Sequence, residues 1–183
     1  EHPKQVFAGM FQMRVEPRYQ KIRQLIQSGE LGRLVRVNWI ITDWFRTEAY
    51  YASGGWRATW KGEGGGVLLN QCPHNLDLFQ WMFGLPKRIR AHCSFGKYHS
   101  IEVEDDVTAY FEFPNGATGV FITSTGEAPG TNRLEITAER GKLDAVFLAD
   151  NAAILATLGP ATLDISPARL GNANTPEAYD QSP

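Results

Sequence analysis

Residues 105–125 read DDVTAYFEFPNGATGVFITST, two runs of alternating apolar residues separated by Pro114-Asn115-Gly116. Alternation with a period of two residues is typical of a β-strand with one buried face. An Asn-Gly pair supplies the positive φ angles of a type I′ turn, so the stretch predicts an antiparallel hairpin with a two-residue turn. The pairs predicted by this turn are Phe113–Thr118, Phe111–Val120, Ala109–Ile122 and Val107–Ser124.

The two faces of this hairpin differ in character. The predicted register puts the listed pairs on a face that helices can cover, and it puts Tyr110 beside Phe121 on the other face. Neither Lys nor Arg occurs between Asp105 and Thr125, so the second face is aromatic, β-branched and weakly charged. A second copy of the sheet is the simplest cover for such a face. The sequence therefore predicts a homo-oligomer, at least a dimer, built through the open sheet face at residues 105–125.

Other segments extend this sheet and add two helices. An almost uncharged run at residues 5–14 predicts a buried strand. Helical spacing, with a proline at the start and a glycine at the end, predicts helices over residues 17–28 and 67–83. Pro73 either bends the second helix or begins it. Residues 46–66 show no period, which is typical of a long functional loop. The further predicted strands are 33–45, 88–97, 132–138 and 142–147.

These elements predict an α+β fold, in which helices pack on one face of a large, mainly antiparallel open β-sheet. The second half of the chain is expected to form an antiparallel meander, and residues from 148 onward are assigned only as extended or irregular. Residues 1–183 are treated as one domain. The chain starts without Met and ends in a polar, proline-bearing stretch, so we expect a fragment of something longer.

Composition excludes several classes of partner. Of the 183 residues, 43% are hydrophobic and 21% charged, which suffices for a globular core. The net charge of -2 gives no electrostatic reason to expect nucleic acid or an anionic membrane. No apolar run is long enough for a membrane span, so a cytoplasmic location is expected. Two cysteines, Cys72 and Cys93, are too few for a disulfide framework and are interpreted as reduced, packed thiols.

The predicted helix at residues 67–83 has two unlike faces. Asn70, His74, Asp77 and Trp81 fall on one side, yet residues 67–83 contain no Lys, Arg or Glu, which is atypical of a solvent-exposed helix face. A shielded imidazole with amide and carboxylate neighbours is a candidate general base. The alternative is a structural histidine that ties a loop to the helix. The opposite, apolar sector comprises Leu68, Cys72, Leu76, Phe79 and Phe83.

Two motifs, in order, resemble the Gfo/Idh/MocA family of oxidoreductases. Residues 64–84, GGGVLLNQCPHNLDLFQWMFG, are similar to the catalytic helix of that family, and residues 13–32 are similar to the entry into its C-terminal domain. The resemblance covers residues 6–147. It implies a protein with an N-terminal Rossmann domain that binds NAD or NADP and a C-terminal domain whose open sheet supplies the substrate pocket. The chain resembles the second domain alone.

The resemblance also implies roles for two residues. In the family a histidine on this helix, four residues after an Asp or Asn, works with a lysine of a Glu-Lys-Pro motif in the first domain. His74 matches that histidine, and Asn70 matches the position four before it. Asn in place of Asp would orient the substrate or His74 rather than take a proton. The sequence contains neither a Glu-Lys-Pro motif nor a G-x-G-x-x-G motif. NAD or NADP is therefore expected to bind mainly to the missing domain.

Residues 46–61 are a candidate substrate loop, because they combine large aromatics with hydrogen-bonding groups as sugar-binding loops do. Arg57, Tyr51 and Trp56 are the predicted substrate-binding residues of this loop, and Asp77 is the predicted contact from the helix. The alternative is that the loop folds on its own aromatics.

Metal binding is not predicted. The spacing of Cys72, His74, His92, Cys93 and His99 fits no zinc pattern. The acidic run at residues 102–106 lacks the glycine of a calcium loop and is interpreted as a solvated strand entry.

The leading functional hypothesis is an NAD(P)-dependent oxidoreductase that acts on a carbinol of a sugar, polyol or sugar derivative, with His74 as acid/base. The fragment alone is predicted to be inactive. Two alternatives stay open at this point: an NAD-dependent glycosidase of the same family, and a non-catalytic sugar-binding or assembly module.

Overall fold

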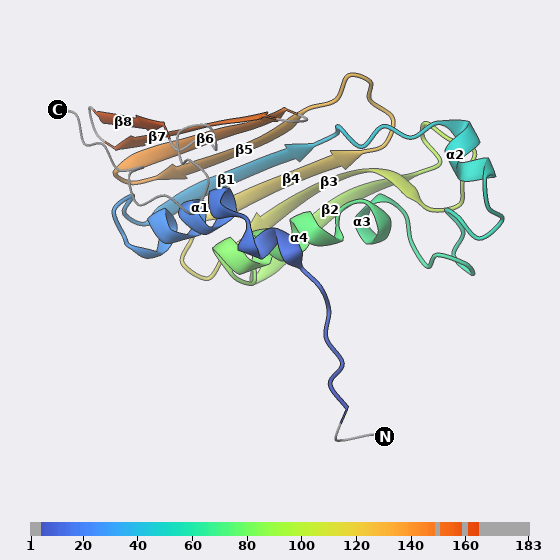
Figure 1. Ribbon diagram of the computed structural model, residues 1–183, viewed down its shortest axis with the longest axis horizontal. Helices are drawn as coiled ribbons and strands as arrows, with labels where there is room; N and C mark the ends of the chain where they lie inside the picture. Colours follow the sequence, from blue (N-terminus) through green and yellow to red (C-terminus); the bar gives the residue numbers. More distant parts are fainter. Residues whose placement is uncertain (1–4, 149–150, 159–160, 165–183) are drawn as a thin grey trace.

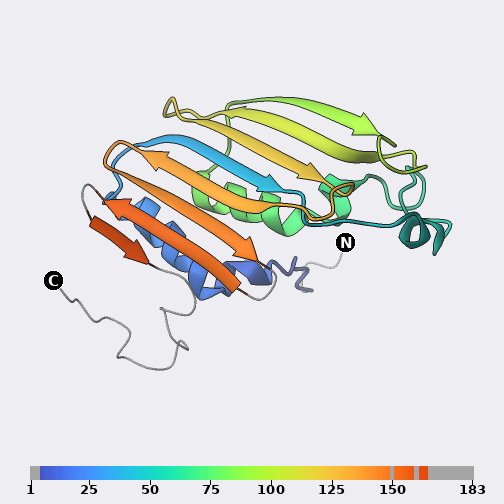
Figure 2. The same cartoon turned by 90° about the horizontal axis from the view of Figure 1, so that it is seen from above.

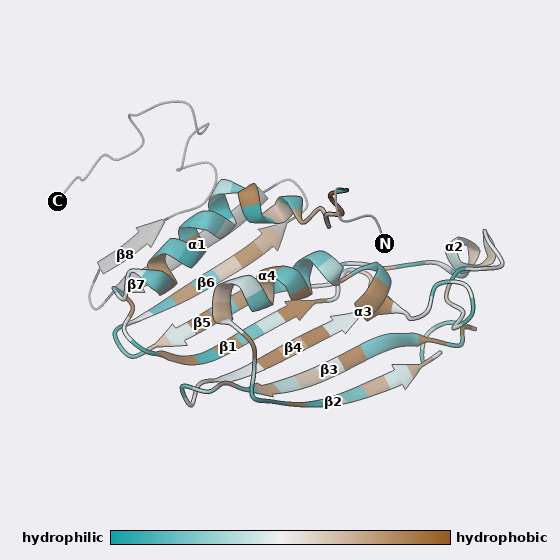
Figure 3. Ribbon diagram, turned by 90° about the horizontal axis from the view of Figure 1, so that it is seen from below, coloured by the Kyte–Doolittle hydropathy of each residue, from teal (hydrophilic) through white to brown (hydrophobic). Residues whose placement is uncertain are grey.

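The computed structural model describes residues 5–148, 151–158 and 161–164 of the chain. Its centre is one 8-stranded open sheet in the order β2-β3-β4-β1-β5-β6-β7-β8 (Figure 1). Figures 2 and 3 show α1 and α4 on the same face of this sheet. The predicted α+β fold with helices on one face is confirmed. The elements are η1 (Gln12–Val15), α1 (Pro17–Gln27), β1 (Leu34–Ile41), α2 (Glu48–Ala52), α3 (Val67–Asn70), α4 (Pro73–Phe83), β2 (Arg88–Phe95), β3 (Glu104–Glu112), β4 (Thr118–Ser124), β5 (Asn132–Ala138), β6 (Gly141–Leu148), β7 (Asn151–Leu158) and β8 (Ala161–Asp164).

Strand β1 lies inside the sheet, between β4 and β5. It pairs with β4 in parallel and with β5 antiparallel. The predicted antiparallel meander is therefore wrong at this point, because an early strand separates β4 from β5. The inward side chains of β1 explain its central position: Val37, Trp39 and Ile41 are all fully buried, and a strand with such a face is stabilised by neighbours on both edges.

The helices seal one face of the sheet with apolar side chains. Helix α1 begins with Pro17 at its first turn and ends before Gly29, whose φ of 77° suits glycine. Its residues Tyr19, Ile22 and Leu25 are buried against the sheet. Within the described residues, no helix is long and apolar enough to cross a bilayer.

The hairpin between β3 and β4 forms, but its register differs from the predicted one by one residue. The loop is three residues long: the amide of Phe113 donates to the carbonyl of Ala117 (2.9 Å), and Gly116 adopts a φ of 85°. Ala109 therefore pairs with Phe121, not with Ile122. The shift turns Phe121 into the core, where it is fully buried, and the predicted outward contact of Tyr110 with Phe121 is wrong.

Residues 5–11 do not form the predicted buried strand. They are extended and exposed, with Val6 at 94% and Phe7 at 101% exposure, before η1 begins. Among the described residues no strand pairs with this run, and an apolar run without a neighbouring edge has nothing to bury against.

The polar helix is divided in two, with α4 beginning at Pro73. This is the second of the two predicted outcomes, since a proline at the first helical position loses no backbone bond. Cys72 and Phe79 are buried as predicted, and Leu78 and Met82 add to the buried face.

The acidic run at residues 102–106 is not a solvated strand entry, contrary to the prediction. Glu104 and Asp105 are buried, at 6% and 0% exposure. Oε1 of Glu104 accepts the amides of Gly66 (3.0 Å) and Leu68 (3.2 Å), which start α3. Asp105 accepts three successive amides between β2 and β3, at residues 97–99. Both carboxylates are satisfied by backbone donors, which the local sequence pattern does not reveal.

Candidate active site

A cavity of about 450 Å³ opens where η1 and α1 meet the end of β1 and the turn between α3 and α4. Most of its lining residues are polar and carry amide, imidazole, carboxylate or guanidinium groups, a composition that suits a ligand rich in hydroxyl groups. The lining residues are Gln12, Met13, Glu16, Arg18, Tyr19, Asp43, Trp44, Arg46, Asn70, Gln71, His74, Asn75, Asn132 and Phe147.

His74, the predicted catalytic residue, lies in this lining near the start of α4. Its ring contacts Phe11 edge-on, with centroids 5.8 Å apart. Nδ1 is buried and has no hydrogen-bond partner among the described residues. Leaving such a nitrogen unpaired costs about 1–3 kcal/mol, so the imidazole is poised for a partner that comes from elsewhere.

Asn70 lines the same cavity, and among the described residues no hydrogen bond joins it to His74. Its amide nitrogen donates to Glu63, and its carbonyl oxygen accepts from Gln71 at 2.8 Å. Glu63 in turn accepts the amide of Ala58 at 2.8 Å. Asn70 is therefore held by the loop before α3, and its side chain is fixed at the cavity wall independently of His74.

Asp77 is taken up by an ion pair and is not in the cavity lining. Both of its carboxylate oxygens accept from Arg14, one of them from Nε at 2.7 Å. Only 9% of the Asp77 side chain is exposed. This ion pair holds η1 against α4. Asp77, which was predicted to contact the substrate, therefore anchors η1 at a position about one helical turn after His74.

The loop residues Arg57, Tyr51 and Trp56 are also outside the cavity lining. Tyr51 donates to Thr125 at 3.1 Å and its ring packs on His99. Arg57 donates to the hydroxyl of Tyr50 at 3.0 Å and stacks on Trp56. These contacts hold the three side chains in place, and their role in substrate binding stays a prediction.

Several lining residues were missed from the sequence. Asp43 lies two residues after the end of β1 and accepts a hydrogen bond from the side-chain amide of Asn132 on β5 at 3.1 Å. Desolvation raises the pKa of Asp43, and the bond from Asn132 opposes that shift. Arg18 and Arg46 also line the cavity. Polar residues just after a buried strand could have indicated a site at Asp43. The contact of Asn132 with Asp43 could not be predicted in this way, because it depends on the pairing of β1 with β5.

A family model described as GFO/IDH/MocA C-terminal domain matches residues 19–144. The chain belongs to the GFO/IDH/MocA family.

Solved structures with the same fold agree with this assignment. The chain is 29% identical to the WlbA dehydrogenase from Chromobacterium violaceum, solved with NADH and UDP-GlcNAcA (TM-score 0.69; 74% of this chain, 39% of that chain). It is 27% identical to WlbA from Bordetella pertussis, also with NADH and UDP-GlcNAcA (TM-score 0.69; 74% and 42%). Aldose-aldose oxidoreductase from Caulobacter crescentus, complexed with glycerol, shares the fold at 21% identity (TM-score 0.68; 85% and 46%).

The chain spans less than half the length of each of these three structures. Among curated proteins no match to the chain was found.

In this GFO/IDH/MocA domain, the backbone amides of Gly66 and Leu68 are bound by a side chain of the domain itself. The one glycine-rich turn that enters a helix, at residues 64–66, directs amides at the buried carboxylate of Glu104 rather than at open space. A Cβ added at Gly66 would lie 1.9 Å from the carbonyl oxygen of Glu104, so this glycine is required by close packing and not by a pyrophosphate.

The cysteines of this family member are packed thiols in the structure. Cys72 and Cys93 are both free. Sγ of Cys72 lies 3.0 Å from Oγ1 of Thr123, and burial raises the pKa of Cys72 to about 12. In the described ranges, no three His, Cys, Asp or Glu side chains come together in a way that could hold a metal ion.

Proposed function

We propose that the chain is the substrate-binding domain of an NAD(P)-dependent oxidoreductase that oxidises a carbinol of a sugar, polyol or sugar derivative. Membership of the GFO/IDH/MocA family and the WlbA structures with NADH and UDP-GlcNAcA support this proposal. NAD or NADP is then held mainly by an N-terminal domain outside this chain, in agreement with the closed glycine turn at residues 64–66.

His74 is the acid/base of the proposed reaction. The observation that carries this role is a buried imidazole nitrogen without a partner in the wall of a polar cavity. When a secondary alcohol becomes a ketone, the hydroxyl proton goes to His74, and the carbon-bound hydrogen leaves with its electron pair. The nicotinamide supplies the acceptor for that hydride. Asn70, held by Glu63 and Gln71, offers a fixed amide to a substrate hydroxyl beside His74.

The test compares His74→Ala with His92→Ala in the full-length protein. His92 lies exposed on β2, away from the cavity lining, and is the matched control. We expect His74→Ala to lower kcat about 10²- to 10⁴-fold, the usual worth of a positioned acid-base group, with little change in cofactor affinity. The readout is NAD(P)H absorbance across a panel of sugars and polyols. A His74→Ala variant with near wild-type turnover would return His74 to a structural role, and release of an aglycone without net NADH would indicate the glycosidase instead.

The partner of the open sheet face is proposed to be a second copy of the chain. In the observed register, Tyr110, Val120 and Ile122 point to the face opposite α1 and α4, and Tyr110 is 40% exposed. This aromatic and β-branched patch suits a sheet-to-sheet dimer. Light scattering at micromolar concentration should give at least a dimer mass for the full-length protein, and Tyr110→Lys with Val120→Lys should reduce it to a monomer. A monomeric wild type contradicts this proposal.

A further inference from the structure

An alternating stack of aromatic rings and arginines leads away from the His74 cavity. The Arg46 guanidinium carbon lies 5.5 Å from the ring centre of Trp44 and 5.0 Å from that of Tyr50. Arg57 continues the stack, at 4.6 Å from Tyr50 and 4.6 Å from Trp56. We call these five residues the arginine ladder. Trp44 and Arg46 line the cavity, and Trp56 at the far end is 51% exposed.

Neither arginine of the ladder has a counter-ion. Among the described residues no carboxylate lies within 4 Å of the Arg46 or Arg57 guanidinium, whereas Arg18 of the cavity lining pairs with Glu16 at 2.5 Å. The one carboxylate between residues 44 and 57, that of Glu48, accepts the amide of Ser100 instead. Stacking fixes the guanidinium planes, but it leaves their charge uncompensated.

Buried nitrogens without a hydrogen-bond partner also indicate a ligand near the arginine ladder. Four buried side-chain nitrogens lack a hydrogen-bond partner among the described residues: His74 Nδ1 and the Nε atoms of Arg18, Arg46 and Arg57. Three of these residues line the cavity and the fourth belongs to the arginine ladder. Buried polar groups in a folded protein are normally satisfied, and three of these four nitrogens are guanidinium donors. Their concentration at this end of the molecule therefore indicates a missing acceptor-rich ligand.

We infer that the substrate is an anionic sugar derivative, whose carboxylate or phosphate binds at Arg46 while its carbinol faces His74. This inference rests on the proposed function and names the substrate class. Arg46 provides the first contact, because it belongs to both the cavity and the ladder, and Arg57 receives the more distant part of the anion. A planar guanidinium held by aromatic rings binds either oxyanion through paired hydrogen bonds.

Asp43 limits where the anion can bind. Its carboxylate lines the cavity and is held by Asn132, so a second negative charge is repelled from that wall. The anion is therefore directed toward the ladder, and the uncharged hydroxyls of the sugar occupy the space near Asp43, where a carboxylate is a good acceptor.

The experiment uses the full-length protein and three forms of one sugar: the neutral aldose, its uronate and its 6-phosphate, for example D-glucose, D-glucuronate and D-glucose 6-phosphate or the corresponding set of whichever ring is turned over. We expect at least one anionic form to exceed the neutral form about 10-fold or more in kcat/KM. The preferred anion tells a carboxylate substrate from a phosphate one. Preference for the neutral form overturns the inference.

Three variants separate binding of the anion from a structural effect. Arg46→Gln should lower kcat/KM for the anion about 10- to 100-fold, the usual worth of a charge-assisted hydrogen bond, and Arg57→Gln should lower it less. For the neutral sugar we expect Arg46→Gln to lower kcat/KM by a clearly smaller factor than for the anion. Equal losses on both substrates would show that the ladder only holds the loop and would overturn the inference.

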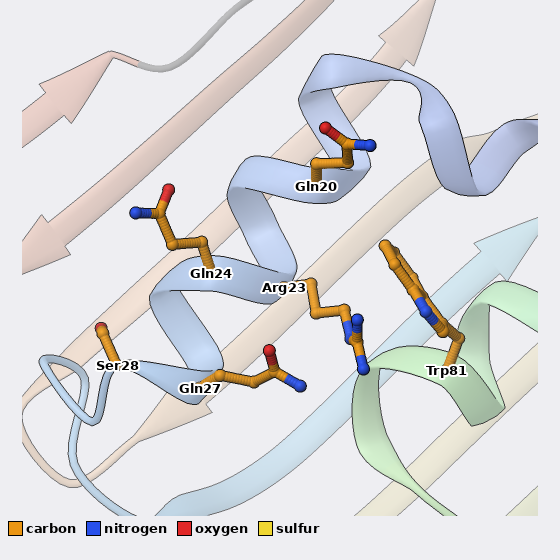
Figure 4. Close-up of a pocket in the computed structure, with 6 residues that line it drawn as sticks. All are labelled: Gln20, Arg23, Gln24, Gln27, Ser28 and Trp81. Carbon is orange, nitrogen blue, oxygen red and sulfur yellow. The ribbon is translucent and has the colours of Figure 1, made fainter.

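Arg23→Gln is the matched control. Arg23 also stacks on an indole, with its guanidinium carbon 4.3 Å from the ring centre of Trp81, but it lies in a separate hollow between α1 and α4 (Figure 4). We expect this variant to leave the preference for the anion unchanged.

Calorimetry distinguishes this inference from the proposed function. If no sugar is oxidised, yet the anionic form binds and Arg46→Gln abolishes that binding, the dehydrogenase proposal fails while the anion site stands. If neutral sugars are oxidised and the anions neither bind nor react, the anion site fails while the dehydrogenase proposal stands.

Discussion

Truncation of Phe121 tests the register of the β3–β4 hairpin, on which both faces of the sheet depend. Phe121 is fully buried and contacts the rings of Trp39 and Phe79 edge-on, with centroids 6.3 and 6.0 Å apart. Phe121→Ala removes a buried aromatic side chain, which costs about 3–5 kcal/mol. Val120, its neighbour in sequence, is only half-buried on the opposite face, and Val120→Ala should cost about 1 kcal/mol.

Urea unfolding followed by tryptophan fluorescence provides the measurement. At a slope of about 2–3 kcal/mol per molar urea, Phe121→Ala should lower the midpoint by roughly 1–2 M and Val120→Ala by less than about 0.5 M. The scans are repeated at several protein concentrations, because a dimer contributes a concentration-dependent part and the core does not. A larger loss for Val120→Ala than for Phe121→Ala, at all concentrations, would refute the three-residue loop and restore the two-residue turn.

Three further outcomes are expected. Desolvation raises the pKa of Asp43 in the folded state, so the folded protein binds that proton more tightly than the unfolded chain and loses stability as pH rises through the folded pKa. Asp43→Asn should therefore stabilise the protein at pH 7 in urea unfolding. The stability gained by this substitution should vanish below the ordinary pKa of 3.8. Cys72, whose pKa is about 12, should resist iodoacetamide at pH 8 in the native protein while the half-buried Cys93 is alkylated first, which mass spectrometry of the peptides would show or contradict. The isolated 183-residue chain should show no low-micromolar affinity for NAD or NADP by calorimetry, since its glycine turn is closed by Glu104; a low-micromolar constant would disprove this.

Local signals were enough for the elements but not for their register. Helix α1 was predictable because Pro17 and Gly29 mark its ends and its apolar residues have helical spacing. The hairpin was predictable for the same kind of reason, but Asn115-Gly116 fits a two-residue turn and a three-residue loop equally well. The two turns differ in the position of Gly116 within the loop. The choice between them decides which residues of β4 are buried.

The candidate site was predictable only for residues that are close in sequence. Asn70 and His74 are four residues apart, and both line the cavity although Asn70 ends α3 and His74 lies in α4. Asp43 and Asn132 are 89 residues apart in sequence and meet because β1 is inserted beside β5. The periodicity of the sequence does not predict that β1 lies between β4 and β5. This position depends on the packing of β1 against its neighbours in the complete sheet.

The arginine ladder was hidden for a different reason, since all of its residues except Trp44 belong to a loop with no period at all. What the sequence does contain is an imbalance: residues 44–57 hold Arg46 and Arg57 but only one acid, Glu48, and the structure uses that acid elsewhere. A stable fold satisfies its buried polar groups, and exceptions concentrate at sites shaped by function. The buried side-chain nitrogens without a hydrogen-bond partner, among the described residues, all belong to the cavity or the arginine ladder. These unsatisfied groups indicate, independently of any sequence motif, that a ligand binds at this end of the molecule.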